Sequence, residues 1–293
     1  MRSWFKSYPV AVPIASLTVA MASFQLGATV AKGLFPAVGA VGAAALRLAL
    51  ATLMLLAVWR PWRVRPSLRE LRTIVIYGVA MGCMNTFFYL SLRTLPLGIS
   101  VALEFTGPLA VAMAASRRPV DFVWIALAAL GLLALLPLGL DSKPLAPAGV
   151  GFALAAGLCW ALYILFGQKA GAVHGGQTAA LGTLVGAIVI VPIAAAQVGA
   201  RLLSPAILPA ALGVALLSSA LPYSLEMFAM TRLPTRTFGV LMSLDPALGA
   251  LAGLYFLGER LTPIQWAAIV SIILASAGSA ATSRTSPRPS LPD

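Results

Sequence analysis

Long apolar runs without a charged residue are the feature that most constrains this chain. No Asp, Glu, Lys or Arg occurs between Lys143 and Lys169, or between Lys169 and Arg201. A helix of about 20 residues is about 30 Å long, enough to cross the hydrocarbon core of a membrane. The runs are continuous, whereas a membrane β-barrel would show alternating segments of about ten residues. The sequence therefore predicts an all-α integral membrane protein.

Composition agrees with this fold class and restricts the partners. Of the 293 residues, 60% are hydrophobic and 10% are charged, and the mean hydropathy is +0.95, so the chain has too few polar groups to cover a soluble globule. A net charge of +12 would suit nucleic-acid binding if the basic residues formed one solvated face, but they lie in short connections between apolar runs. We expect membrane lipid as a partner and no nucleic acid.

Ten transmembrane spans fit the apolar runs. Fourteen of the 20 lysine and arginine residues then fall on the side of the N-terminus, five fall on the opposite side, and Arg47 lies inside a span. The positive-inside rule therefore predicts both termini in the cytoplasm and the protein in a bacterial inner membrane. The opening MRSWFKSYP resembles a signal peptide, but we interpret the run after it as an uncleaved first span. The predicted spans are about 10–31, 38–59, 71–92, 97–115, 120–138, 148–167, 176–199, 206–230, 235–257 and 262–282.

An internal repeat divides these spans into two halves. Leu95–Pro108 (LPLGISVALEFTGP) and Leu233–Pro246 (LPTRTFGVLMSLDP) share Leu-Pro, Leu and Pro at one spacing, 246 − 108 = 138 residues. Because five spans per half is an odd number, the second half enters from the opposite side, which predicts inverted repeats around a central cavity. We predict residues 1–140 as the first five-helix repeat, 141–147 as the joint, 148–282 as the second repeat, and 283–293 as a disordered cytoplasmic tail.

Four ionisable side chains lie inside predicted spans, where each costs at least about 2.5–3.5 kcal/mol at the helix centre. They are Arg47, Glu104, Glu226 and Asp245. Arg47 has two interpretations, as a structural ion pair with a carboxylate or as a bidentate clamp for the carboxylate of a substrate. Glu226 lies one turn from Tyr223, and both a structural and a functional role fit this position.

Glu104 and Asp245 occupy corresponding stretches of the repeat, and a proline, Pro108 or Pro246, follows each of them. Proline removes a backbone hydrogen bond, so the freed carbonyl groups can line a cavity. One interpretation is a packed kink with a locally satisfied acid. The other is proton coupling, because a carboxyl group held away from water can bind and release protons near neutral pH. Glu104, Glu226 and Asp245 are the candidate proton carriers.

Polar and aromatic side chains recur on the first and third spans of each half, often about one turn apart. A single residue of this kind is more often a contact between helices than a ligand contact, but together they suit a cavity between inverted repeats. Asn85 and Tyr223 are repeat partners. We predict substrate binding by Arg47, Asn85, Tyr89, Glu104, Trp160, Tyr163, Tyr223 and Glu226, and a cavity lined by Gln25, Thr29, Pro108 and Pro246.

Metal, cofactor and enzyme chemistry have little support in the sequence. Cys83 and Cys159 both fall inside spans and are expected to be buried free thiols rather than a disulfide. His174 lies in the Gly-rich segment GAVHGG, where we expect a surface loop, and a lone histidine supports neither a metal cluster nor a Ser-His-Asp site inside a span. No phosphate-binding loop followed by Lys-Ser or Lys-Thr occurs. We expect no cofactor, no metal and no enzymatic activity.

The chain resembles the drug/metabolite transporter superfamily (EamA-type), and within it the bacterial threonine/homoserine exporters. The segments that carry the resemblance run along nearly the whole chain: MASFQLGA, RLAL, VALEFTGPLAVA, SRRPVDFVW, GAVHG, LPYSLEM and TRLPTRTFG. Gly258-Glu259 fits the superfamily's usual loop before the last span, whereas its first-half counterpart, Ser116–Pro119, departs from that pattern. The resemblance implies ten helices in two inverted repeats, and export of L-threonine and L-homoserine in exchange for protons.

The candidate residues match the chemistry of such a substrate. A zwitterionic hydroxy amino acid needs a cation for its carboxylate, an anion for its ammonium and polar groups for its hydroxyl. Arg47, a carboxylate such as Glu104 or Glu226, and Asn85 or Tyr223 supply that set. The alternatives are an exporter of other amino acids or of small amphipathic metabolites or drugs, and a non-transporting membrane sensor or enzyme. A monomer and a homodimer both fit the sequence.

Overall fold

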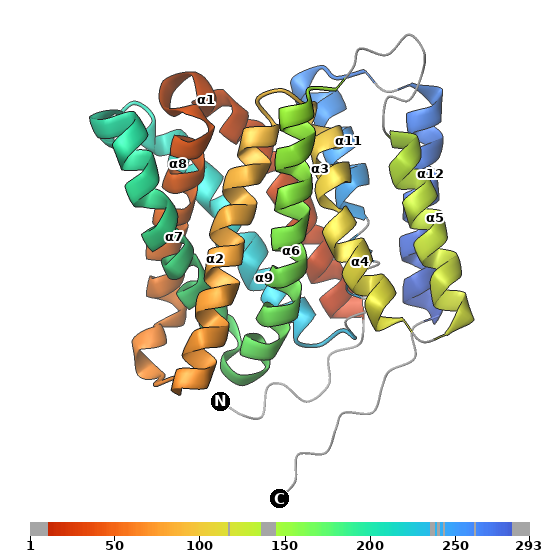
Figure 1. Cartoon of the computed structure of the whole chain (residues 1–293), viewed down its shortest axis with the longest axis horizontal. Helices are drawn as coiled ribbons and strands as arrows, with labels where there is room; N and C mark the ends of the chain where they lie inside the picture. Colours follow the sequence, from red (N-terminus) through yellow and green to blue (C-terminus); the bar gives the residue numbers. More distant parts are fainter. Residues whose placement is uncertain are drawn as a thin grey trace, which may run out of the picture.

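The fold of the chain is known from a computed structural model, which describes residues 11–116, 118–135, 145–234, 238, 241–242, 244–260 and 262–282. All regular structure in these ranges is helical (Figure 1). The α-helices are α1 Ala11–Trp59, α2 Leu68–Ser91, α3 Leu97–Glu104, α4 Thr106–Ala115, α5 Pro119–Leu135, α6 Pro147–His174, α7 Gly176–Val198, α8 Leu208–Ala215, α9 Leu221–Met230, α11 Leu244–Leu257 and α12 Pro263–Thr282. Two 3₁₀ turns, η1 Pro61–Arg63 and η2 Gly199–Leu203, and a π-helical turn, η3 Leu216–Ala220, join them.

Five stretches of the described chain are long and apolar enough to cross a membrane. They are Ala11–Trp59, Leu68–Ser91, Pro147–His174, Gly176–Leu203 and Leu208–Met230. Shorter apolar helices cover Leu97–Val111, Pro119–Ala134, Leu244–Leu257 and Trp266–Ala275. The prediction of an all-helical, membrane-spanning chain is confirmed at this level.

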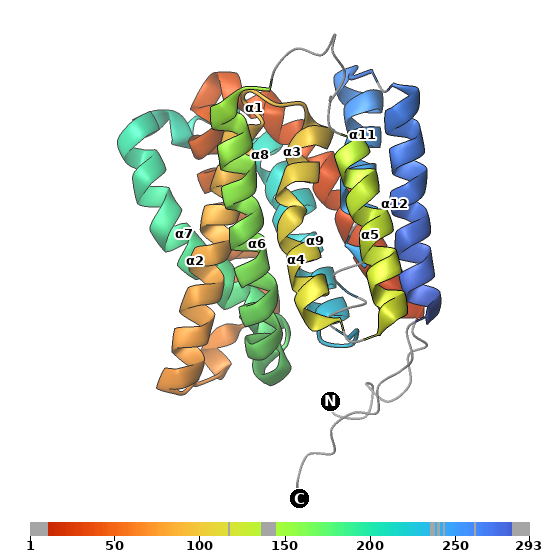
Figure 2. The ribbon, with the colours of Figure 1, turned by 45° about the vertical axis from the view of Figure 1, so that its right-hand side comes forward.

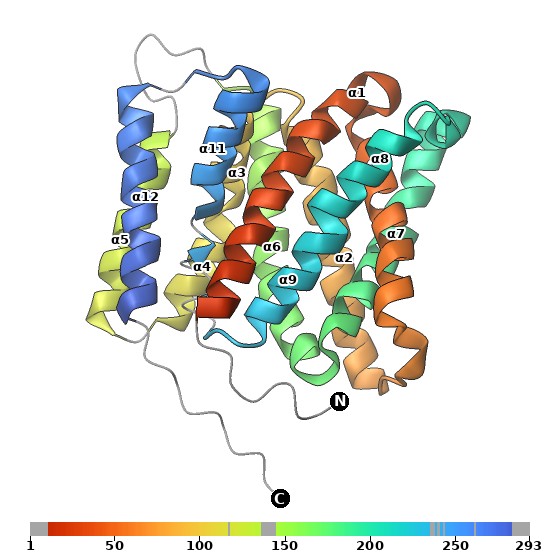
Figure 3. The ribbon, with the colours of Figure 1, turned by 180° about the vertical axis from the view of Figure 1, so that it is seen from behind.

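α1 is a helical hairpin that contains the first two predicted spans. It runs along the molecule and turns back at Gly39, whose backbone has φ 67° and ψ 175° (Figure 3). Glycine adopts this conformation without the steric cost that a Cβ would impose. The expected end of the first span near residue 31 was too early, because the helix continues through Lys32 and the small and apolar residues from Gly33 to Val38 up to the turn.

Two predicted spans are interrupted at prolines. Pro108 has no N–H to donate to the carbonyl of Glu104, four residues earlier, and the helix breaks at Phe105 between α3 and α4. Pro222 likewise leaves the carbonyl of Ser218 without its helical donor, next to the π-helical η3 that separates α8 from α9. Freed backbone carbonyls therefore lie in the middle of the bundle.

The packing places α1 and α6 at the centre of the bundle. α1 contacts α7, α8, α9 and α11, whereas α6 contacts α2, α3 and α4. α5 and α12 lie side by side along one flank, and α7 lies at the opposite flank (Figures 1 and 2). α3 packs against α11 between these flanks.

Glycines allow the closest approaches between helices. The ring of Tyr77 on α2 lies between Gly167 of α6 and Gly182 of α7, where an added Cβ would lie 2.8 Å and 2.1 Å from ring carbons. Gly107 of α4 and Gly157 of α6 meet backbone to backbone. Close backbone approach through small residues is a usual packing mode of membrane helices.

Three further predictions have an outcome in the structure. Cys83 and Cys159 are free thiols, as expected, although both are only partly buried. The prediction of a surface loop at His174 is wrong: His174 is the last residue of α6, its side chain is 7% exposed, and its Nε2 lies 3.7 Å from Oε2 of Glu70. The helix continues that far because it meets no stop signal before Gly175, with φ 56°.

Some predicted segments lie outside the described residues. These are the opening segment 1–10, most of the joint at 141–147, and the tail 283–293.

Candidate functional site

A small cavity lies in the middle of the bundle, lined by side chains from six helices. Its volume is about 20 Å³, which is room for about one water molecule. The lining residues come from α1, α2, α3, α6, α9 and α11, and they are Phe24, Met84, Glu104, Trp160, Tyr223, Glu226 and Asp245. Three carboxyl groups and three aromatic rings therefore share one enclosed space.

The three carboxyl groups differ in their hydrogen bonds. Oδ1 of Asp245 accepts a hydrogen bond of 2.8 Å from Nε2 of Gln25, and Oε2 of Glu226 accepts one of 2.9 Å from the Tyr163 hydroxyl. The Glu104 carboxyl group makes no side-chain hydrogen bond or ion pair with the described residues, although it is only 3% exposed. A buried polar group without a partner is costly, so Glu104 is the carboxyl group most available to a ligand in the cavity.

Arg47 is completely buried, and hydroxyl groups and a backbone carbonyl surround its guanidinium. Nε donates to Oγ of Ser219 at 2.6 Å, Nη2 donates to the hydroxyl of Tyr223 at 3.1 Å, and Nη1 lies 3.4 Å from the hydroxyl of Tyr89. Nη2 also donates to the carbonyl of Ser218. This is the carbonyl that Pro222 leaves without a helical donor. The irregular helix at η3 therefore supplies one of the groups that surround the Arg47 guanidinium.

No carboxylate of the described residues lies within 4.0 Å of the Arg47 guanidinium. The structural ion pair considered from the sequence is therefore absent from this part of the chain. Aromatic rings take its place, with the guanidinium carbon 4.6 Å from the ring centre of Phe24 and 5.5 Å from that of Tyr89. Cation–π contacts stabilise such a charge in part, but they leave its net charge uncompensated.

Asn85 and Tyr223 connect the arginine to the cavity. Nδ2 of Asn85 donates to the Tyr223 hydroxyl at 2.6 Å and to the carbonyl of Met81 at 2.8 Å. Oδ1 of Asn85 and Oε1 of Gln25 are both buried without a partner in the described chain. These two oxygens are free acceptors close to the cavity, of the kind that an ammonium or hydroxyl group of a ligand would satisfy.

Aromatic rings hold Tyr163 in place against Glu226. The rings of Tyr163 and Tyr77 are stacked with centres 5.0 Å apart, and the rings of Tyr163 and Tyr223 are tilted with centres 6.1 Å apart. Trp160 meets Phe105 edge to face with centres 6.3 Å apart. The tyrosine hydroxyl that binds Glu226 is therefore fixed by packing on both sides.

The structure brings the predicted substrate-binding residues together, but none of the four predicted cavity-lining residues lines the cavity. Gln25 reaches it only through its hydrogen bond to Asp245, Thr29 donates to the carbonyl of Gln25 within its own helix, and Pro108 and Pro246 are buried elsewhere. Sequence reasoning missed Phe24, Met84, Tyr77, Ser218 and Ser219. Phe24 and Met84 directly precede the predicted Gln25 and Asn85, but an apolar residue in an apolar span carries no signal of its own.

Metal binding has no support in the described part of the chain, where no group of three or more His, Cys, Asp or Glu side chains converges. The described side chains bring charge of both signs into the middle of the bundle. This arrangement suits the recognition of a small polar molecule.

Comparison with known proteins extends these observations. Residues 147–280 match the EamA-like transporter family. The threonine/homoserine exporter RhtA of Escherichia coli (strain K12) is 58% identical over 284 residues, covering 97% of this chain and 96% of that protein. The chain belongs to the EamA-like transporter family. Membership places it among membrane transporters rather than enzymes.

Other relatives agree with this assignment. The threonine/homoserine exporter RhtA of Salmonella typhimurium (strain LT2) is 57% identical, with 97% of this chain and 96% of that protein covered. An uncharacterized transporter, YwfM of Bacillus subtilis (strain 168), is 25% identical over 75% of this chain and 77% of its own length. A solved crystal structure shares the fold with a TM-score of 0.69 at 18% identity, covering 92% of this chain and 96% of the other.

Proposed function

We propose that this protein exports L-threonine and L-homoserine across the inner membrane of a bacterium. The support is 58% identity over nearly the whole length to a relative of that name. The observation that carries the proposal is the buried Arg47 guanidinium, which has no carboxylate partner among the described residues. Tyr223 connects it to a cavity lined by Glu104, whose carboxyl group has no partner in the same part of the chain.

The substrate's own charges would complete this site. The carboxylate of the amino acid would bind Arg47 bidentately, displacing weaker hydroxyl contacts. Its ammonium group would lie against Glu104, and its hydroxyl would reach Asn85 or Tyr223. Aromatic side chains of the cavity would exclude water, which strengthens both charge contacts.

We further propose that ten spans form two inverted five-helix repeats. α5 packs on α12 and α3 packs on α11, and each pair joins predicted counterparts. α2, in the third span of the first half, contacts α6, in the first span of the second half. Correspondingly, α8 and α9, in the third span of the second half, contact α1, which contains the first span of the first half. The bond between Asn85 and Tyr223, 138 residues apart, also supports this arrangement, because repeat partners can touch only near the axis that exchanges the two halves.

Transport would follow alternating access, in which the two halves move about the cavity. A cavity of about 20 Å³ is too small for an amino acid, so the described conformation would have to open on one side before substrate enters. Glu104, Glu226 and Asp245 remain the candidate proton carriers for exchange of substrate against protons. The positive-inside count supports cytoplasmic termini, with the Gly39 turn on the outer side, for a monomer or a homodimer.

Flux of labelled threonine into and out of vesicles that contain only the purified protein tests this function. With an imposed pH gradient we expect threonine flux above that of protein-free vesicles, and unlabelled homoserine should compete for it. Competition by hydrophobic amines or other amino acids with no competition by homoserine would favour the alternative substrates. No flux of any of these compounds, with or without the gradient, would favour a sensor or an enzyme.

A further inference from the structure

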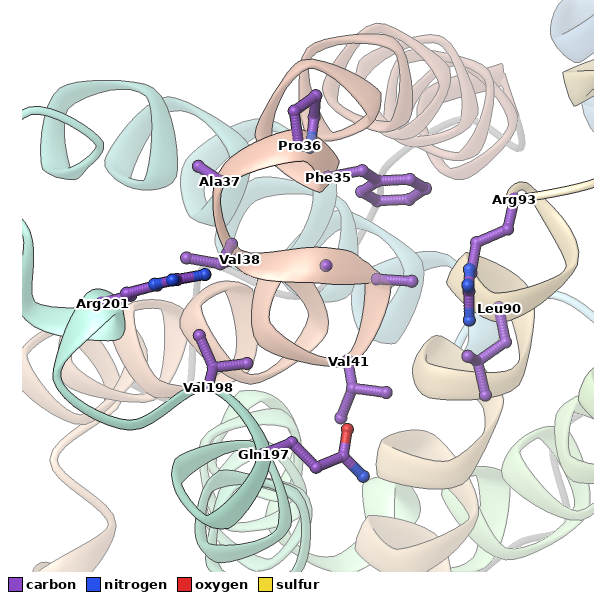
Figure 4. A pocket seen from close by; sticks show the side chains of 12 residues that line it. Phe35, Pro36, Ala37, Val38, Val41, Leu90, Arg93, Gln197, Val198 and Arg201 are labelled. Atoms are coloured by element: carbon purple, nitrogen blue, oxygen red, sulfur yellow. The ribbon is translucent and has the colours of Figure 1, made fainter.

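A second and larger hollow lies at the end of the bundle where α1 turns back. Its volume is about 650 Å³, and it is bordered by the α1 turn, the end of α2, and the end of α7 with η2 (Figure 4). None of its lining residues belongs to the central cavity. We call it the turn hollow.

Positive charge collects around the turn hollow. Arg93, just after α2, and Arg201, in η2, lie on opposite sides of it, and Gln197 of α7 lies along a third side (Figure 4). Neither arginine side chain makes a hydrogen bond or ion pair with the described residues, and no Asp or Glu lines the hollow. Two guanidinium groups beside one space without a counter-charge favour an anion between them.

Apolar side chains lie among the polar groups that line the turn hollow. Phe35, Val38, Val41, Leu90 and Val198 contribute to its lining. At Gly39 an added Cβ would have no atom within 4 Å, so the backbone itself borders open space there. Apolar side chains beside two cations match a ligand that has an anionic head and an apolar body.

The position of the hollow relative to the membrane favours a lipid as that ligand. Arg93 follows the membrane-capable helix Leu68–Ser91, and Arg201 lies near the end of Gly176–Leu203, which is the level of the lipid head groups. Ile193 and Leu203 nearby are 47% and 78% exposed, and such apolar surface on a membrane helix faces acyl chains. Guanidinium groups bind phosphate through short charge-assisted hydrogen bonds, so two arginines at this level suit the phosphate of an acidic lipid.

We propose that the turn hollow binds an acidic phospholipid, with the phosphate between Arg93 and Arg201 and the upper part of the acyl chains against the neighbouring apolar side chains. The site is separate from the transport cavity and does not depend on which amino acid is exported.

Native mass spectrometry of the purified full-length protein with phosphatidylglycerol or phosphatidylcholine tests this proposal. We expect preferential binding of phosphatidylglycerol, and a loss of about 30-fold in its affinity in the double variant Arg93→Gln, Arg201→Gln, which corresponds to about 2 kcal/mol at 1.4 kcal/mol per tenfold change. Arg260→Gln is the matched control, because Arg260 is an exposed arginine outside the hollow, and it should bind lipid like the wild type.

Three outcomes would overturn the proposal. These are equal binding of the two lipids by the wild type, undiminished phosphatidylglycerol binding by a double variant with a wild-type circular dichroism spectrum, and an equal loss in the Arg260 control. Inorganic phosphate is added in a separate arm. The site would be assigned to a dissolved anion instead if millimolar phosphate displaces the lipid and if phosphate itself binds the wild type but not the double variant.

Discussion

Replacing Gly107 by alanine tests how closely α4 and α6 approach beside the cavity. A Cβ at position 107 would lie 1.9 Å from the carbonyl oxygen of Gly157 and 2.7 Å from its carbonyl carbon. Ordinary contact begins near 3.4 Å, so the two backbones must separate by 3.4 − 1.9 = 1.5 Å. Because both contacting groups are backbone, no side-chain rotation relieves the overlap.

The cost follows from this displacement. Overpacking costs about 1–3 kcal/mol when side chains can adjust, and we expect a value at the upper end here, about 3 kcal/mol, because the helices must move. That is a factor on the order of 100 in the ratio of folded to unfolded protein, and a melting temperature lower by on the order of 10 °C. Movement of α4 also carries Phe105 away from Trp160, so threonine flux should fall.

Thermal unfolding of the purified protein in detergent measures the effect, with threonine flux in vesicles as the second readout. Gly151→Ala is the control on the same helix as Gly157, because a Cβ at position 151 meets nothing within 4 Å. Alanine there should leave the melting temperature unchanged or raise it slightly, since alanine favours a helix by about 1 kcal/mol over glycine. Wild-type stability and flux in Gly107→Ala would refute the close approach of α4 and α6.

Three further substitutions test the site and its surroundings. Glu104→Gln should abolish threonine flux driven by a pH gradient while the protein still inserts; retained coupled flux would remove Glu104 from the mechanism. Arg47→Lys should reduce flux at least about tenfold, equivalent to about 1.4 kcal/mol, because lysine keeps the charge but lacks the planar fork; wild-type flux would show that charge alone suffices. Glu259→Gln should lower the free energy of unfolding by up to about 1 kcal/mol, since Oε1 of Glu259 accepts from the backbone N–H of Leu97 at 3.0 Å and lies 3.8 Å from Lys32 Nζ. High salt should reduce this difference from the wild type. A difference that does not depend on salt would exclude the ion pair as its cause.

The helical membrane fold and the unusual polar residues within it could be predicted from the amino-acid sequence. Apolar runs must form helices in a bilayer, because no water is present to satisfy free backbone groups. Four side chains could be selected without coordinates, because placing an ionisable group inside a span costs free energy and such groups usually face a partner or a cavity. They are Arg47, Glu104, Glu226 and Asp245. All four are buried in the structure, and three line the same cavity.

Which side chains meet in the site depends on the packing of segments that are distant in the sequence. The partners of Arg47 at Ser218, Ser219 and Tyr223 are 171 to 176 residues away in the chain, and they take the place of the carboxylate that one of the two interpretations of Arg47 expected. The sequence did not predict that Phe24 lines the cavity, because a helix that is apolar on every side does not reveal which face points inward. Chain order fixed the helices, but packing across the bundle selected the faces that form the site.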